Sequence, residues 1–328
     1  MDIGIKKPDY VIGEDSFSAK LAESLGSRHR LVRHEYYPDG EPSPRILADY
    51  GELEGKHVVF VHRVSQLPNR DKICRGLHNA ERIVGNLKYM FNANEIDVLM
   101  PYYLFSRQDK DARSSNDLMV RERDHGKDIG YEFVARALKA QGARRIITLT
   151  PHFHRGIDGE YDVIGVCGID VVCICGVNAL ARYAKGLIED GRMNEKGLII
   201  APDEHSYGLA KKFADKIEAD YKIEIMEKKR IDGKHVLRNG IVDMHKNDIV
   251  VIDDILSTLG TVETLIESVR NTNDVDIFAI HGVFPEEGLR RATSLVSSGK
   301  ARRIVTTDSI DNDYARASIL PDIKGLYL

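Results

Sequence analysis

Short apolar runs recur along the chain, and between them lie longer stretches in which apolar residues return every three or four positions. The run over residues 249–252 is β-branched throughout and too short for a helix, which indicates a strand buried on both faces of a parallel sheet. The stretch with Ala179, Leu180, Tyr183 and Leu187 has the spacing of an amphipathic helix. By the same pattern, strands are expected at residues 10–13, 31–37, 57–61, 96–100, 145–149, 171–175, 198–201, 221–226, 249–252, 277–281 and 304–307.

This alternation of strand and helix predicts an α/β fold with mainly parallel sheets covered by helices. The chain has 328 residues. That length favours two domains of about 150 residues each, and the two halves could be copies of one architecture. Residues 156–168 are rich in glycine and acidic side chains and are expected to form the junction. Residues 109–127 are dense in charge and predict a long mobile loop, either a functional lid or a linker.

The composition is that of a soluble globular protein. Hydrophobic residues make up 42% and charged residues 30%, and the net charge of −4 gives no reason to expect nucleic acid as a partner. No apolar run approaches the roughly 20 residues that cross a bilayer, and the amino terminus lacks a signal-peptide pattern, so a cytoplasmic protein is expected. Cys173 and Cys175 alternate in an apolar segment, which favours buried, reduced thiols over disulfides or a metal site.

Candidate chemistry concentrates after the strand expected at residues 249–252, where Asp253 and Asp254 precede a short loop. Ligands of open α/β sheets gather at the carboxyl ends of the strands. Two carboxylates can accept hydrogen bonds from vicinal sugar hydroxyls, and the loop offers hydroxyls and backbone N–H groups to a phosphate at the start of the next helix. A purely structural alternative is a buried strand whose acidic residues cap that helix. The loop residues are Ser257, Thr258, Leu259, Gly260 and Thr261.

Two segments of the first half are distinctive in residue type, although the first, taken alone, means only a hairpin. An aromatic-Pro-Asp-Gly-Glu turn follows one expected strand, and an Arg-Gln-Asp segment follows another. An aromatic ring can stack on a base, carboxylates can accept from amine and sugar hydroxyls, and an arginine can contact a polyphosphate. The structural alternatives are a plain hairpin turn and an exposed arginine that begins a charged loop. They become nucleotide candidates only through the family resemblance that follows, and the residues are Tyr37, Asp39, Glu41, Arg107, Gln108 and Asp109.

Taken together and in order, these motifs resemble the ribose-phosphate diphosphokinase (PRPP synthetase) family. The loop after Asp254 is also similar to the phosphoribosyl-diphosphate loop of type I phosphoribosyltransferases. The resemblance implies two phosphoribosyltransferase-like (type I) domains, each a mainly parallel sheet flanked by helices. Residues 1–155 would carry the ATP-side motifs, residues 156–308 the ribose 5-phosphate loop, and residues 309–328 a tail that packs on the amino-terminal domain.

The reaction that the resemblance implies is transfer of the β,γ-diphosphate of ATP to O1 of ribose 5-phosphate, giving PRPP and AMP. Lys228 and Arg230 match a Lys-x-Arg pair that stabilises the transferring diphosphoryl group. Mg²⁺ would lie near His152 and Asp203. ATP would contact the six nucleotide candidates, and ribose 5-phosphate would contact Asp203, the aspartate pair and the loop after it. A nucleotide site built from two subunits implies a homo-oligomer, a dimer or larger.

Three places depart from the family pattern. Leu259 stands where a small residue is usual, Thr150 replaces an aspartate, and residues 204–206 (Glu-His-Ser) replace small residues. A bulky side chain at Leu259 would crowd the phosphate, although a negative φ there would tolerate it. These departures leave open a catalytically silent regulatory subunit. A type I phosphoribosyltransferase is a further alternative, against which the ATP-side motifs argue.

Overall fold

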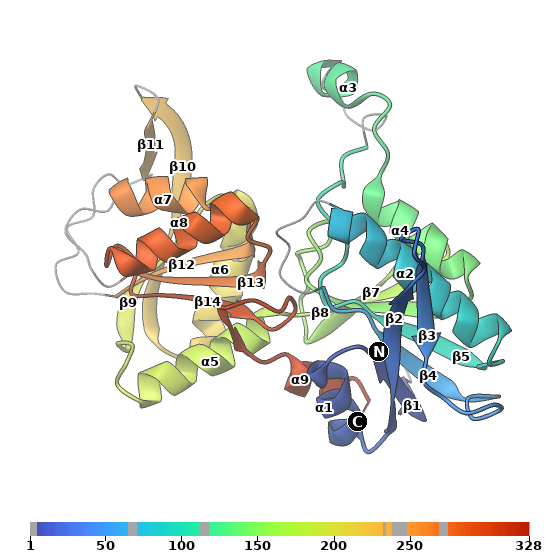
Figure 1. Ribbon diagram of the computed structural model, residues 1–328. Coiled ribbons are helices and arrows are strands. Elements are labelled where there is room, and N and C mark those ends of the chain that lie inside the picture. Colours follow the sequence, from blue (N-terminus) through green and yellow to red (C-terminus); the bar gives the residue numbers. More distant parts are fainter. Residues whose placement is uncertain are drawn as a thin grey trace. The chain divides into compact units, whose positions relative to one another are not determined.

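The computed structural model describes residues 5–64, 71–111, 118–231, 234–237, 248–268 and 275–327. The chain divides into two compact units, each built on one sheet (Figure 1). The described residues up to Ile174, together with residues 322–327, form the first unit, and residues 175–321 form the second. The expected α/β class, with two mainly parallel sheets flanked by helices, is confirmed.

The first unit is built on an eight-stranded sheet. Its strands are β1 (Tyr10–Gly13), β2 (Arg28–Tyr36), β3 (Pro42–Ile46), β4 (His57–Val61), β5 (Glu95–Leu99), β6 (Arg145–Leu149), β7 (Tyr161–Val166) and β8 (Ile169–Ile174). They lie in the order β3-β2-β1-β4-β5-β6-β8-β7, and only the edge strands β3 and β7 run antiparallel to their neighbours. β4 is buried along its whole length, as a strand covered on both faces must be.

Helices cover both faces of this sheet. They are α1 (Ser16–Leu25), α2 (Asp71–Tyr89), α3 (Leu118–Asp124) and α4 (Gly130–Ala140). The carboxylate of Asp15 caps α1 by accepting from the Ser18 N–H at 3.0 Å, and Gly26 ends that helix with a left-handed backbone. α2 and α4 pack together on one face and α1 lies on the other, while α3 stands apart from the sheet (Figure 1).

The second unit is built on a seven-stranded sheet. Its strands are β9 (Lys196–Ala201), β10 (Asp220–Ile231), β11 (Lys234–Leu237), β12 (Asp248–Leu256), β13 (Val275–Gly282), β14 (Arg303–Thr307) and β15 (Ala315–Ala317). They lie in the order β11-β10-β9-β12-β13-β14-β15, and all pairs are parallel except β10 with β11. The outer half of β10 pairs with β11 in an antiparallel hairpin.

The helices of the second unit also lie on both faces of its sheet. They are α5 (Val177–Glu189), α6 (Glu204–Ile217), α7 (Gly260–Ser268) and α8 (Glu286–Ser297), and α9 (Leu320–Gly325) follows them in the chain. α7 and α8 lie on one face and α5 on the other (Figure 1). Leu265 of α7 and Leu295 of α8 share one apolar core with Val251 and Ile277 of the sheet. This packing fixes the loop that joins β12 to α7.

Three expectations about the organisation differ from the structure. Residues 156–168, expected as a junction, hold β7, which pairs with β8 and extends the first sheet; the division therefore falls after Ile174 instead of after residue 155. Residues 109–127, expected as one long loop, contain α3, whose Leu, Met, Arg and Glu residues are strong helix formers. β15 pairs with β14, so the tail that groups with the first unit begins at Asp322 and not at residue 309.

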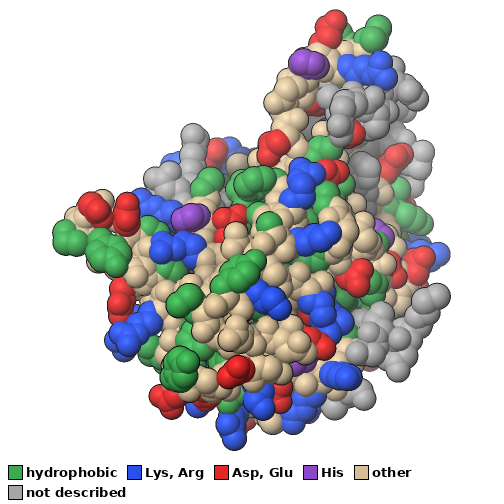
Figure 2. Space-filling view, turned by 90° about the vertical axis from the view of Figure 1, so that its right-hand side faces the viewer, with side chains coloured by type: hydrophobic (Ala, Val, Ile, Leu, Met, Phe, Trp, Pro, Cys, Tyr) green, Lys and Arg blue, Asp and Glu red, His purple; other side chains and the backbone are tan. Residues whose placement is uncertain are grey.

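The charged side chains and the cysteines are arranged as the sequence led us to expect. Basic and acidic side chains are interspersed over the face shown in Figure 2. None of the four cysteines, all of which lie in described segments, forms a disulfide, and Cys173 and Cys175 are buried as expected. Burial raises the pKa of the Cys173 thiol to about 12. Of the helices that the structure describes, none combines the length and the apolar character needed to cross a membrane.

Candidate functional site

A serine hydroxyl joins two carboxylates at neighbouring strand ends of the second sheet. β9 and β12 pair in parallel, so Asp203, just after β9, and Asp253, near the end of β12, lie at the same edge. Ser206 Oγ lies 3.0 Å from Asp203 Oδ1 and 2.9 Å from Asp253 Oδ1. The Ser206 N–H donates to Asp203 Oδ1 at 2.9 Å, which makes Asp203 the N-cap of α6. Two of the sugar-binding candidates are thus brought together.

Each of these carboxylates uses only one of its oxygens. Asp253 Oδ1 accepts a second hydrogen bond from the Asp254 N–H at 2.9 Å. In the part of the chain that the structure describes, neither Asp203 Oδ2 nor Asp253 Oδ2 has a hydrogen-bond partner. Both outer oxygens are therefore available to a ligand.

The Ser206 hydroxyl lies near two carboxylate oxygens but has one proton, so it can donate to only one of them. The other contact is a hydrogen bond only if that carboxyl carries a proton. Burial, and after it the negative charge of Asp254, raise the pKa of Asp253 to about 7, against the hydrogen bond from Ser206 that lowers it. A proton on Asp253 allows Ser206 to accept from one carboxyl and donate to the other. Both contacts are then hydrogen bonds.

The loop after β12 is held from behind by an arginine of α8. Arg291 Nη1 donates to the Thr258 carbonyl at 3.2 Å. The same guanidinium pairs with Glu287 at 2.6 Å and lies 3.7 Å from a carboxylate oxygen of Glu263 in the first turn of α7. Because the arginine donates to a carbonyl of the loop and pairs with Glu287 of its own helix, it ties the loop backbone to α8.

The start of α8 approaches the loop closely as well. A Cβ on Gly288 would lie 2.0 Å from the Ser257 carbonyl oxygen, so only glycine fits there. α7 begins at Gly260, and the first N–H groups of a helix have no acceptor within it. These N–H groups and the hydroxyls of Ser257, Thr258 and Thr261 have the chemistry that an anion requires, and their contact with a phosphate stays a prediction.

Leu259 adopts the backbone conformation that was not expected of it. Its φ is 61°, in the left-handed region, whereas a negative φ was the condition under which the loop would tolerate this side chain. The side chain is 4% exposed and belongs to the core that includes Val262 and Phe284. The leucine therefore points away from the loop surface and does not crowd it. A left-handed backbone costs about 1–2 kcal/mol for a residue with a Cβ, and burial of the side chain offsets that cost.

In the first unit, the Pro-Asp-Gly turn joins β2 and β3 into the expected hairpin. Asp39 Oδ1 accepts from the Glu41 N–H at 3.1 Å, and Gly40 has a φ of 90°. Tyr37 is 58% exposed, and Asp39 and Glu41 are exposed too. The turn thus presents an aromatic ring and two carboxylates to solvent, and their contact with a nucleotide stays a prediction.

Arg107 and Gln108 line a cavity of about 700 Å³, together with Lys110, Lys127 and Asp128. The Gln108 carbonyl accepts from the Gly130 N–H at 3.0 Å, which ties the segment to the start of α4. Asp109 is not among the residues that line this cavity. Arg107, Lys110 and Lys127 can contact a polyphosphate, although Asp124 and Asp128 also line this cavity and Asp124 pairs with Lys127 at 2.8 Å.

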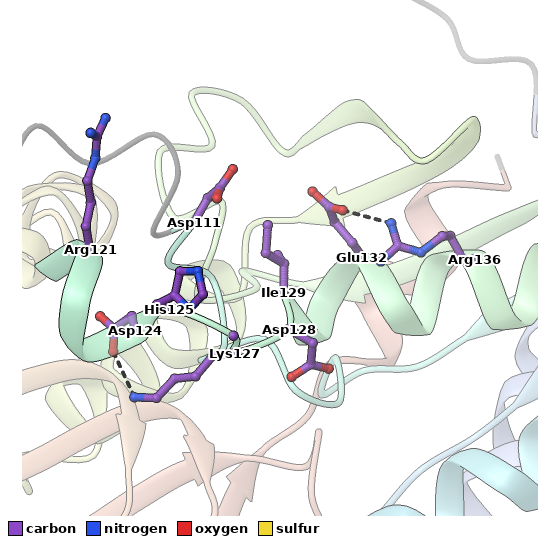
Figure 3. A pocket seen from close by; sticks show the side chains of 10 residues that line it. Asp111, Arg121, Asp124, His125, Lys127, Asp128, Ile129, Glu132 and Arg136 are labelled. Atoms are coloured by element: carbon purple, nitrogen blue, oxygen red, sulfur yellow. Dashed lines mark hydrogen bonds and ion pairs between the residues drawn. The ribbon is translucent and has the colours of Figure 1, made fainter.

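A second cavity of about 700 Å³ adjoins the first and shares Lys127 and Asp128 with it (Figure 3). Figure 3 shows its lining, which comes from α3, α4 and the turn between them, together with Asp111. Lys127 Nζ pairs with Asp124 Oδ1 at 2.8 Å on one side, and Arg136 pairs with Glu132 at 2.9 Å on the other.

His152 and Thr150 follow β6. Arg155 Nε donates to the His152 carbonyl at 2.9 Å, and Arg155 Nη2 lies 3.4 Å from His152 Nε2. A guanidinium beside that ring nitrogen disfavours a metal cation there. Thr150, which stands where the family has an aspartate, is buried and turns its hydroxyl toward the Ile174 carbonyl at 3.3 Å.

The remaining candidates cannot be placed in full. Lys228 and Arg230 lie in β10, and their side chains fall outside the described part of the structure. His152 belongs to the first unit and Asp203 to the second, and each is described within its own unit. Among the residues that the structure describes, no three His, Cys, Asp or Glu side chains gather closely enough to hold a metal ion.

Three residues of these sites were not predicted from the sequence: Ser206, Arg291 and Lys127. Ser206 was noted only as a departure from a small-residue pattern, yet its place three residues after an N-cap aspartate is a signal that a side-chain oxygen lies over the first turn. Arg291 and Lys127 gave no local signal, because each acts on a segment far from it or on a cavity that only the fold creates.

Comparison with known proteins points to one group. A ribose-phosphate pyrophosphokinase of Methanopyrus kandleri is 26% identical over 307 residues, which cover 93% of this chain and 92% of the relative. One from Bacillus caldolyticus is 28% identical over 294 residues, which cover 89% of this chain and 81% of the relative. No protein-family model matches the chain.

The fold comparison agrees. The crystal structure of phosphoribosylpyrophosphate synthetase from Mycobacterium smegmatis superposes with a TM-score of 0.69 and covers 97% of both chains at 19% identity. At that identity the match shows a shared fold.

Proposed function

This chain is a relative of the ribose-phosphate pyrophosphokinases, and on that premise we propose that it transfers the β,γ-diphosphate of ATP to O1 of ribose 5-phosphate, giving PRPP and AMP. The observation that carries the proposal is the pair Asp203 and Asp253. Ser206 joins them at the carboxyl ends of β9 and β12. The loop that leads into α7 follows β12. Vicinal sugar hydroxyls can donate to the outer carboxylate oxygens, and the 5-phosphate fits the loop of residues 257–261.

In this proposal the protein positions the reactants and stabilises charge. The nucleophile is the substrate's own hydroxyl at C1, so the rate depends on holding it in line with the β-phosphorus of ATP. Asp253 and Asp254 orient the sugar, and the loop anchors its phosphate. Lys228 and Arg230, assigned by resemblance, stabilise the negative charge on the transferring diphosphoryl group.

Asp203 suits a magnesium ion better than His152 does. Mg²⁺ prefers oxygen ligands, keeps several waters and needs only one or two protein carboxylates beside the phosphates. Asp203 offers an oxygen without a partner among the described residues, whereas His152 Nε2 faces Arg155. When bound, the ion would offset the charge of the ATP phosphates.

The ATP side of the proposal uses the first unit. Arg107 and Gln108 line a cavity that also holds Lys110 and Lys127 beside two aspartates, and Tyr37, Asp39 and Glu41 stand exposed on a hairpin. A hairpin that presents its candidates to solvent suits contact with a nucleotide held by a second copy of the chain. We therefore include a homo-oligomer, a dimer or larger, in the proposal, and a cytoplasmic site of action in keeping with four free thiols.

Phosphorus NMR of the purified protein with ATP, ribose 5-phosphate and Mg²⁺ tests the reaction. The wild type is expected to produce AMP and PRPP. Lys228→Ala and Asp253→Asn are each expected to lower kcat at least a hundredfold, whereas Lys196→Ala, which changes an exposed lysine in the same unit, leaves it unchanged. Production of ADP in place of AMP would contradict transfer of a diphosphate.

One alternative has support of its own. Thr150 turns inward where the family has an aspartate, and residues 204–206 are larger than the family pattern. A wild type that binds ATP but makes no PRPP would favour a catalytically silent regulatory subunit. Formation of a nucleotide from PRPP and a base would favour a phosphoribosyltransferase.

A further inference from the structure

Ser206 lies in the first turn of α6, close to the end of β12. Its hydroxyl is not needed to cap its own helix. The N-cap of α6 is complete without it, because the Ser206 backbone N–H already donates to Asp203 Oδ1 at 2.9 Å. The hydroxyl adds a contact to a different element, reaching Asp253 Oδ1 on β12 at 2.9 Å. The side chain is 2% exposed, so water does not compete for this contact.

The bridge decides which carboxylate oxygens remain for a ligand. The Ser206 hydroxyl contacts Oδ1 of Asp203 and Oδ1 of Asp253. Asp253 Oδ1 also accepts a hydrogen bond from the Asp254 N–H. The two Oδ2 atoms have no partner within the described residues. A carboxylate whose inner oxygen is fixed cannot turn freely about its last bond, so its outer oxygen is held in one direction before the sugar arrives.

We propose that Ser206 is a positioning residue for ribose 5-phosphate, whose hydroxyl locks Asp203 and Asp253 together so that their outer oxygens are preorganised for the vicinal sugar hydroxyls. The proposal rests on the proposed function for the identity of the sugar. It assigns a role to a residue of the 204–206 segment, which departs from the small-residue pattern of the family.

The position also has a matched control on the same helix turn. Tyr207 is the next residue, is 41% exposed and carries a hydroxyl that does not touch the bridge. Tyr207→Phe removes a hydroxyl from α6 and leaves Asp203 and Asp253 as they are. Ser206→Ala removes the bridge and keeps the backbone cap. Ser206→Gly removes it as well, without the methyl group that could itself fill the site.

Isothermal titration with ribose 5-phosphate, run beside steady-state kinetics, tests the proposal. Ser206→Ala and Ser206→Gly are each expected to weaken ribose 5-phosphate binding about tenfold and to raise its KM by a similar factor. The KM for ATP should stay within twofold of the wild type, and so should every value for Tyr207→Phe. A merely structural role would move both KM values or the melting temperature, and would not separate the two substrates.

The outcomes separate this inference from the proposed reaction. Unchanged ribose 5-phosphate affinity in both Ser206 variants overturns the inference, even if PRPP is formed. A tenfold loss of affinity in a protein that forms no PRPP supports the inference and rejects the reaction. A wild type that does not bind ribose 5-phosphate overturns both.

Discussion

Asp97 and Asp276 occupy equivalent positions in the two sheets. Each is fully buried, and each lies in register with the second of two consecutive arginines on the next strand, Asp97 with Arg145 and Asp276 with Arg303. Asp97 Oδ1 lies 3.1 Å from Arg144 Nε, and Asp276 Oδ1 lies 2.9 Å from Arg302 Nε. The same ion-pair arrangement thus supports the amino ends of both sheets, which is what two copies of one architecture would contain.

Replacement of either aspartate should destabilise its unit strongly. Asp97→Asn or Asp276→Asn leaves two arginines near a neutral buried group, and loss of one partner from a buried pair costs about 3–5 kcal/mol. Urea unfolding followed by circular dichroism measures the change. Asp220→Asn is the matched control, because Asp220 lies 3.9 Å from Lys196 with both side chains 75% exposed, and no measurable change is expected there. Equal losses in all three variants would contradict this account.

The pH dependence of stability should carry the signature of Asp253. Its pKa in the folded protein is raised from 3.8 to about 7, by burial and then by the charge of Asp254. The folded state therefore holds a proton that the unfolded state releases between pH 4 and pH 7, and this contribution to stability is lost as the pH rises through that window.

Asp253→Asn removes the titrating group and keeps its shape. Relative to the wild type, the variant is expected to become more stable as the pH rises from 4 to 7, and the difference should level off above pH 8. Thermal unfolding at pH 5 and pH 8 measures it. A difference with the opposite slope would mean that the folded protein lowers the pKa of this carboxyl.

Leu259 offers a test of backbone strain against burial. Leu259→Ala loses the buried side chain and keeps a Cβ at a φ of 61°, whereas Leu259→Gly loses the same side chain and relieves the left-handed backbone. Both should be less stable than the wild type, but the glycine variant should be the more stable of the two by about 1 kcal/mol. Chemical denaturation gives the order, and an alanine variant more stable than the glycine variant would contradict the strain.

Gly288 should be essential to the loop for a steric reason. In Gly288→Ala the new Cβ would meet the Ser257 carbonyl at 2.0 Å, so the loop or α8 must move, and we expect ribose 5-phosphate affinity to fall more than tenfold. Gly186→Ala is the control, since a Cβ there meets nothing within 4 Å in the middle of α5. That variant should gain about 0.5–1 kcal/mol of stability with unchanged affinity. Titration calorimetry and thermal unfolding distinguish the two results.

The strands with buried apolar runs were predictable from the sequence, and the edge strands were not. All eleven expected strands occur, and most of them are apolar because a strand covered on both faces must be; β2, which is largely exposed, is an exception. β3 contains Pro42 and Pro44, and β7 contains Asp162 and Gly165, which an edge strand tolerates and a local pattern does not signal.

The same distinction holds at the site. Asp203 and Asp253 follow apolar runs and were predicted, while the link between them was not, because Ser206 reaches its second partner only when β9 and β12 become neighbours. The direction of the Leu259 side chain likewise depends on a backbone angle that the residue type does not favour. Residue types thus revealed the reactive groups, and only the fold revealed how they are held.

The repeated arginine–aspartate support has a consequence for how this protein can change. It lies at the amino ends of the strands, whereas Ser206, Leu259 and the lining of the two cavities follow the carboxyl ends. Substitutions in the loops of one unit should therefore leave the buried arginine–aspartate ion pairs of that unit intact. The two units can thus differ in the chemistry of their loops while both keep the same ion-pair arrangement. Exchange of loops between the units is a rational route to new substrate preferences.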